Sequence, residues 1–185
     1  TPDGRDATSG ALFLPPEPSL TPSDIGYTGR MSIGDTASIT TPSAGKHGLV
    51  TFSGERGQRV ALKVQNYGHA YSSMTLYGPN GLTVGPTTGT SIYSMGMLDT
   101  VTLPDSGTYT LYMYPSGGTS AASLSIYEVA ADTVGEIEAS GPQVTLTTAT
   151  PGQNHKLTFE GAAGQRISLR LSNLTYGSGY GAYVS

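Results

Sequence analysis

The feature of this sequence that most constrains its fold is a segment that occurs twice. Residues 34–66 align without a gap with residues 141–173, at an offset of 107 positions, and twelve of the paired residues are identical. A repeat of this length indicates a repeated domain, because solenoid units are only about 20–50 residues long. Residues 30–130 would form one complete unit, and residues 141–185 correspond to the first half of a second unit. The sequence therefore predicts one complete domain followed by the first half of another.

Apolar and polar residues alternate with a period of two in both copies, which predicts β-strands with one buried face. The 26 glycines and 12 prolines punctuate the chain throughout and disfavour long helices. Short strands with frequent turns favour an all-β, antiparallel sandwich, here of about eight strands. The predicted inward rows are Val60, Leu62 and Val64, their counterparts Ile167, Leu169 and Leu171, and the row Tyr109, Leu111 and Met113.

Glycines recur at the turns between these strands. Gly54 and Gly57 flank a short polar loop, and Gly161 and Gly164 flank the matching loop of the second copy. Their recurrence predicts positive φ values that other residues would adopt only under strain. A further turn is expected at residues 103–108, Leu-Pro-Asp-Ser-Gly-Thr, where Gly107 is the structural turn residue.

The segments outside the complete unit suggest how the protein assembles. Residues 1–29 are Pro-rich and read as a linker, and residues 131–140 read as a second linker. Residues 141–185 form half a sandwich, whose unpaired edges and open core would be costly in water. We expect this half to be completed by continuation of the chain or by a strand from another chain. The candidate donor strand is Ala11, Leu12, Phe13 and Leu14.

Four motifs occur in an order that resembles the bacterial pre-peptidase C-terminal-like domain. They are LVTF at residues 49–52, GQRV at 57–60, MTLYGPNG at 74–81 and LPDSGTYTL at 103–111. The resemblance implies a jelly-roll-like β-sandwich without catalytic residues. Such domains occur as accessory modules of secreted enzymes and as tandem units of large surface proteins. Some members are implicated in calcium contact, but this sequence has no dense acidic cluster.

Tyrosine is the residue type that most suggests a binding surface. Tyr112 and Tyr114 fall on the face of their strand opposite the inward row, and Tyr67 and Tyr71 lie in a neighbouring cluster. Exposed tyrosines offer a large contact area with a polar tip, which suits glycan or protein contact. The competing interpretation is that β-strands favour tyrosine and that these rings cover sheet edges or the joint between modules.

The composition disfavours several classes of function. The net charge of −4 gives no basic footprint for nucleic acid, and no apolar run approaches the roughly 18 residues of a membrane span. The absence of Cys excludes disulfides and thiolate metal sites. We expect His47, His69 and His155 to be exposed turn residues, and we expect no metal or cofactor.

The sequence therefore predicts a non-catalytic structural or adhesive module, extracellular or on the cell surface. Its expected partners are neighbouring copies of the same module, in the same chain or in other chains, with a surface glycan as a further candidate. The alternative is an accessory carbohydrate- or protein-binding module of a secreted hydrolase. Saturable binding to a polysaccharide would support only the alternative.

Overall fold

A computed structural model describes residues 20–66, 72–85, 90–92, 95–115, 118–119 and 121–175. The chain divides into two compact units. The first comprises Thr1–Ala130 with Thr150–Gly152, and the second comprises Ala131–Ala149 with Gln153–Ser185. The candidate donor strand at residues 11–14 lies outside the described residues.

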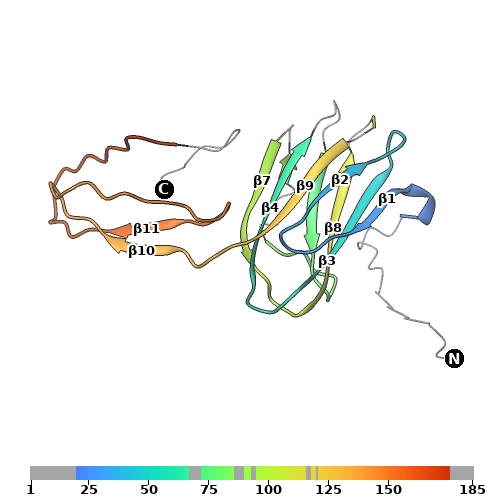
Figure 1. The fold of residues 1–185 in the computed structure, drawn as a ribbon, viewed down its shortest axis with the longest axis horizontal. Helices are drawn as coiled ribbons and strands as arrows, with labels where there is room; N and C mark the ends of the chain where they lie inside the picture. The colour runs from blue at the N-terminus through green and yellow to red at the C-terminus, as the bar shows by residue number, and fades with distance from the viewer. Residues whose placement is uncertain are drawn as a thin grey trace. The chain divides into compact units, whose positions relative to one another are not determined.

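The first unit is a β-sandwich, as predicted (Figure 1). A five-stranded sheet has the order β1-β3-β8-β5-β6, and a four-stranded sheet has the order β2-β9-β4-β7. A short 3-10 helix at Pro22–Asp24 precedes the first strand. The strands are β1 (Ile25–Arg30), β2 (Thr36–Thr40), β3 (His47–Gly54), β4 (Arg59–Asn66), β5 (Ser72–Tyr77), β6 (Thr90–Ile92), β7 (Met95–Thr102), β8 (Gly107–Pro115) and β9 (Ala121–Glu128).

Strand β1 corrects the boundary of the predicted N-terminal linker. It lies within residues 1–29 for most of its length and pairs with β3 in parallel, with Arg30 opposite Thr51. The parallel direction follows from the path of the chain, which crosses to β2 in the other sheet before it returns as β3. The other strand pairs of the sandwich are antiparallel, as expected.

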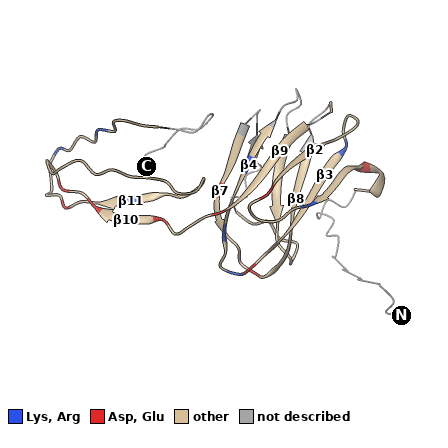
Figure 2. Ribbon diagram, viewed as in Figure 1, with Lys and Arg blue, Asp and Glu red and all other residues tan. Residues whose placement is uncertain are grey.

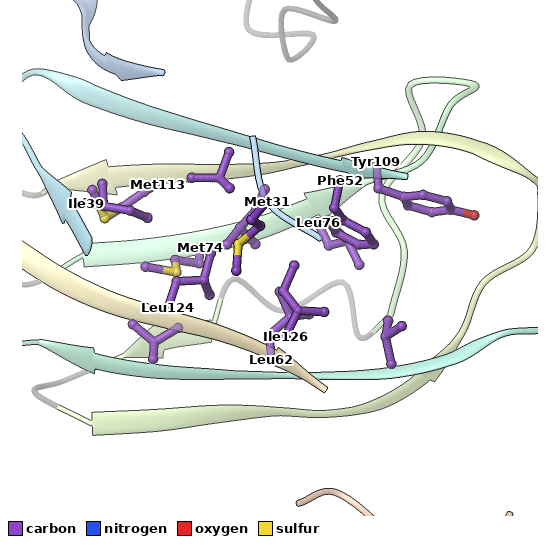
Figure 3. Packing of buried hydrophobic residues seen from close by; sticks show 14 of the residues in the cluster. Met31, Ile39, Phe52, Leu62, Met74, Leu76, Tyr109, Met113, Leu124 and Ile126 are labelled. Carbon is purple, nitrogen blue, oxygen red and sulfur yellow. The ribbon is translucent and has the colours of Figure 1, made fainter. Parts of the chain in front are cut away.

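The core lies between the two sheets and contains the two inward rows predicted for the first unit (Figure 3). Alternate residues of β3, β4, β8 and β9 point into it, so the period of two identified the buried face of these strands correctly. Phe52 of β3 and Tyr109 of β8 are opposite each other in the ladder, and their rings stack with centroids 5.4 Å apart. Two of the three predicted rows contribute Val60, Leu62, Val64, Tyr109, Leu111 and Met113. The third predicted row, Ile167, Leu169 and Leu171, is exposed in the second unit.

Tyr109 also fixes the turn that precedes it. Its ring is completely buried, and its hydroxyl donates a hydrogen bond of 2.6 Å to the carbonyl of Asp105. The backbone N–H of Asp105 donates in return to the Tyr109 hydroxyl at 3.3 Å. Burial raises the pKa of the Tyr109 phenol, so the hydroxyl stays protonated and remains a donor at neutral pH. This arrangement is a tyrosine corner, in which one ring anchors the start of a strand.

The repeated glycines serve two different purposes. Gly57 has a φ of 84° and Gly164 has a φ of 80°, so the predicted positive φ is confirmed for both. Gly54 does not have a positive φ, because its role is packing. A Cβ atom at Gly54 would lie 2.3 Å from Cδ1 of Leu103, which is buried.

The remaining turn glycines divide in the same way. Gly107 has a φ of 148°, and a Cβ atom there would lie 2.7 Å from Cγ of Pro79, so both conformation and packing exclude other residues. Gly161 matches Gly54 and likewise has no positive φ. The prediction of positive φ was therefore wrong for the first glycine of each repeated loop.

The second unit repeats the opening of the first. Its strands β10 (Thr133–Glu136) and β11 (His155–Thr158) pair in parallel, as β1 and β3 do. Strand β10 therefore lies inside residues 131–140, which the sequence analysis assigned to a linker. The hydroxyl of Thr158 donates to the carbonyl of Gly135 at 3.4 Å, as Thr51 donates to Gly29 at 3.4 Å. The repeat thus begins one strand earlier than its sequence identities indicate.

The structures of the two copies also differ by one residue near the start of the gapless alignment. Gly34 takes a φ of 100° in the first unit, and Ser140, not Gly141, takes the corresponding φ of 65°. In the same turn the N–H of Asp35 donates to Ser32, whereas that of Gly141 donates to Glu138. Gly34 and Gly141 are therefore aligned in the sequence but occupy different positions in the turn.

Replacement of Tyr109 by phenylalanine tests the corner. We expect Y109F to lower the free energy of unfolding of the first unit by about 1–3 kcal/mol, because two backbone groups of Asp105 lose a buried partner. Urea denaturation followed by circular dichroism measures the change. Y127F, on the half-buried Tyr127 of β9, is the control and should stay within about 0.5 kcal/mol of the parent.

Two glycine variants separate packing from backbone strain. G54A should cost about 1–3 kcal/mol by overpacking against Leu103. G57A should cost about 1–2 kcal/mol by strain alone, because no atom lies within 4 Å of the added Cβ. In an L103A background the cost of G54A should fall, whereas the cost of G57A should be unchanged. Equal behaviour of the two variants would contradict this assignment.

Candidate functional site

The structure corrects the expectation that Tyr112 is an exposed binding residue. Its side chain is only 5% exposed, and it belongs to a second small hydrophobic cluster on the five-stranded sheet. Tyr67 and Tyr71 lie outside the described residues. Tyr114 lies in β8 opposite Ser73 of β5, and its side chain is outside the described part of the structure. The described residues therefore bring no tyrosine-lined binding face together.

The cluster around Tyr112 contains His47, Leu49 and Tyr77, and we call these four residues the aromatic cluster. The His47 and Tyr112 rings stack with centroids 5.4 Å apart, and Tyr77 meets Tyr112 edge-on at 6.4 Å. Nδ1 of His47 and the hydroxyl of Tyr112 are 2.5 Å apart. Leu20 and Ile25 pack against this cluster. Leu20, which precedes β1, and Ile25, the first residue of β1, thus help to cover the aromatic cluster.

The same geometry overturns the expectation that the histidines are exposed turn residues. His47 begins β3 and is buried. His155 begins β11 and is half-buried, with Nε2 at 3.1 Å from the hydroxyl of Thr148. Both residues therefore lie on strands and not in the predicted turns, and neighbouring residues cover them wholly or in part. His69 lies outside the described residues.

Charged groups offer no alternative site in the described part of the chain. Figure 2 shows Lys, Arg, Asp and Glu scattered along the ribbon without a large patch of one sign. Among the described residues, no three His, Cys, Asp or Glu side chains are grouped to hold a metal ion. In the same residues, no helix is both long and apolar enough to cross a membrane.

The most unusual surface feature of the described residues is a set of exposed apolar side chains in the second unit. Phe159, Ile167, Leu169 and Leu171 are 49%, 55%, 61% and 48% exposed. Their counterparts in the first unit, Phe52, Val60, Leu62 and Val64, are between 0% and 2% exposed. We call the first four residues the open apolar row. Equivalent sequence therefore gives a buried core in one unit and an exposed row in the other.

The reason lies in what covers the row in the first unit. Phe52 packs on Tyr109 of β8, and β4 pairs with β7 and β9. Within residues 131–175 the only strands are β10 and β11, so no such layer is present there. Covering each large apolar side chain is worth about 1.5–3 kcal/mol, so leaving the open apolar row in contact with water is costly.

Truncation of Tyr112 distinguishes a packing role from a ligand-binding role. We expect Y112A to lower the free energy of unfolding of the first unit by about 3–5 kcal/mol, as removal of a buried aromatic ring does. Chemical denaturation of the full chain measures this cost. T28A, at an exposed position of β1 in the same sheet, should have little effect. A small effect of Y112A would restore the interpretation of Tyr112 as a surface contact.

Comparison with known proteins gives similarities at the level of solved structures only. No family model and no curated protein matches the chain. A pre-peptidase C-terminal domain of a Bacillus anthracis collagenase is similar over 54% of this chain and 93% of its own, with 17% identity and a TM-score of 0.39. A mutant of the Escherichia coli periplasmic inhibitor of g-type lysozyme covers 55% and 98%, with 18% identity and a TM-score of 0.37. The surface-associated copper-binding protein CorA of Methylomicrobium album BG8 covers 56% and 98%, with 11% identity and a TM-score of 0.41. The solved structures similar to this chain thus include a pre-peptidase C-terminal domain, the family that its motifs resemble.

Proposed function

We propose that this protein is a non-catalytic structural module of an extracellular or cell-surface assembly, built from repeated β-sandwich units. In the assembly, strands of a neighbouring module complete the half unit formed by residues 131–175. Those strands follow in the same chain in a tandem array, or come from another chain in a fibre. The open apolar row is the single observation that carries the proposal.

Two further properties support this function. The repeated residues at the turns and strands are scaffold residues in the first unit, because Gly57 fixes a turn conformation, as Gly164 does in the second, and Phe52 packs in the core. The aromatic cluster, which includes the Tyr112 suggested as a binding residue, is buried in packing. A module of this kind acts through its surfaces and its neighbours.

A completed second unit is the direct test. A chimera joins residues 1–173 to a second copy of residues 67–130, which supplies the strands that the first unit uses. We expect a second unfolding transition with an m-value similar to that of the first unit, because m scales with the surface exposed on unfolding. The bonds after Arg166 and Arg170 should become resistant to trypsin in the chimera and remain cleavable in the parent chain.

A variant of the chimera provides the matched control. F159D places a charge in the core of the second unit only, so the second unit should lose its resistance while the first unit keeps its own stability. A chimera that remains cleavable at Arg166 and Arg170 would contradict the proposal. Such a result would mean that the open apolar row is not half of a sandwich core.

A further inference from the structure

In the first unit, the turn at residues 55–58 is hydrogen-bonded to residues 103–106, the segment that leads into β8. The N–H of Gly57 donates to the carbonyl of Leu103 at 2.8 Å, and the N–H of Leu103 donates to the carbonyl of Gln58 at 2.9 Å. The N–H of Arg56 donates to the hydroxyl of Ser106 at 2.9 Å. These three bonds fix the backbone of the incoming segment and select a short hydroxyl side chain at its fourth position.

Side chains of the same segment add shape selectivity. Leu103 is 1% exposed and lies over Gly54 so closely that a Cβ atom there would approach Cδ1 of Leu103 to 2.3 Å. Tyr109, six residues later, stacks on Phe52. Gly54 and Phe52 on one segment therefore pack against Leu103 and Tyr109 on the other.

The second unit already has this turn in the same conformation. The N–H of Gln165 donates to the carbonyl of Ala162 at 3.0 Å, as Gln58 does to Glu55 at 3.0 Å. The side-chain oxygen of Gln165 accepts from the N–H of Ala162 at 2.9 Å, and Gln58 accepts from Glu55 at 3.1 Å. The turn is thus organised without the segment that it holds in the first unit.

The position that corresponds to the leucine contact is open. A Cβ atom at Gly161 would have only ordinary contacts, the nearest at 3.5 Å to Gln165 and to Phe159. At Gly54 the equivalent atom would collide with Leu103. Gly161 has no positive φ, so its backbone conformation does not require glycine. Packing against an incoming leucine explains why this position is glycine in both units.

We infer that Gly161–Arg166, together with Phe159, binds the Leu-x-x-Ser-Gly-x-Tyr segment of a neighbouring module's second half. We call these residues the receptor turn. The leucine packs over Gly161, the serine hydroxyl accepts from the N–H of Ala163, and the tyrosine stacks on Phe159. The inference rests on the proposed function and adds the point of recognition and the sequence that is recognised.

One polar contact of the first unit also has a counterpart in the second. In the first unit, Nε2 of Gln58 donates to Oε1 of Glu128 at 3.3 Å. Gln165 occupies the equivalent position and is available for the same bond with an acidic residue at the end of the incoming layer.

The test uses a fluorescently labelled peptide of residues 103–128 and the full 185-residue chain. The peptide contains no trypsin site, so it also serves in a protection assay. We expect a saturable increase in anisotropy, together with protection of the bonds after Arg166 and Arg170. Cleavage within the first unit should not change, because that unit contains its own copy of the segment. A peptide of the same composition in reversed order should bind at least about tenfold more weakly, since only the native order presents the leucine and the tyrosine together.

A double-mutant cycle locates the contact. G161A should weaken binding of the native peptide about tenfold or more, because the added methyl group overpacks against the leucine. An L103A peptide should bind more weakly to the parent chain, but G161A should cost it much less than tenfold. This coupling identifies the glycine–leucine contact, and the peptide variant leaves the protein itself unaltered.

Saturable binding that G161A does not weaken, equal binding of the reversed peptide, or no binding at all would each overturn the inference. If the chimera of the previous section folds its second unit while the peptide fails these tests, the inference is wrong and the proposed function stands. If the chimera also remains cleavable, both are wrong.

Discussion

The fold depends on contact between two crossovers of the chain. Between β3 and β4 the chain passes from the five-stranded sheet to the four-stranded sheet, and between β7 and β8 it passes back. The two crossovers bond to each other through Gly57, Gln58 and Leu103. Because each crossover joins both sheets, this contact fixes the position of one sheet relative to the other. The buried Tyr109 adds a hydrogen bond to the carbonyl of Asp105 in the second crossover.

This constraint explains which polar residue the repeat retains. Gln58 and Gln165 each accept a backbone N–H across their own turn, so the side chain is part of the turn and not a surface group awaiting a ligand. Arg59 donates to the carbonyl of Ala130 at 3.0 Å, which attaches the end of the first unit to β4. The repeated residues therefore describe how the chain crosses between sheets and how a unit is closed.

Sequence periodicity predicted the strands and the core, but it could not predict what covers the outer face of a sheet. Tyr112 alternates correctly with Leu111 and Met113, yet Leu49 and Tyr77 bury it from neighbouring strands. Strand β1 escaped prediction because its Gly26 and Gly29 weaken the alternating pattern, and its parallel partner is distant in sequence. The prediction of a positive φ at Gly54 was wrong for the same reason. The residue that requires a glycine there by packing, Leu103, lies in another crossover that is distant in sequence.

The contrast between the two units separates local from non-local determinants of this fold. The receptor turn is closed by bonds between residues three apart, and the equivalent turn of the first unit has the same bonds. Burial of Phe159 and Leu169 requires a layer that is distant in sequence, and both remain exposed where that layer is missing. Forming a non-local contact costs conformational entropy, because both contacting segments must become ordered. A turn that is already ordered lowers this cost for one of the two segments. Docking at the receptor turn would therefore come first, and burial of the open apolar row would follow as the added strands pair.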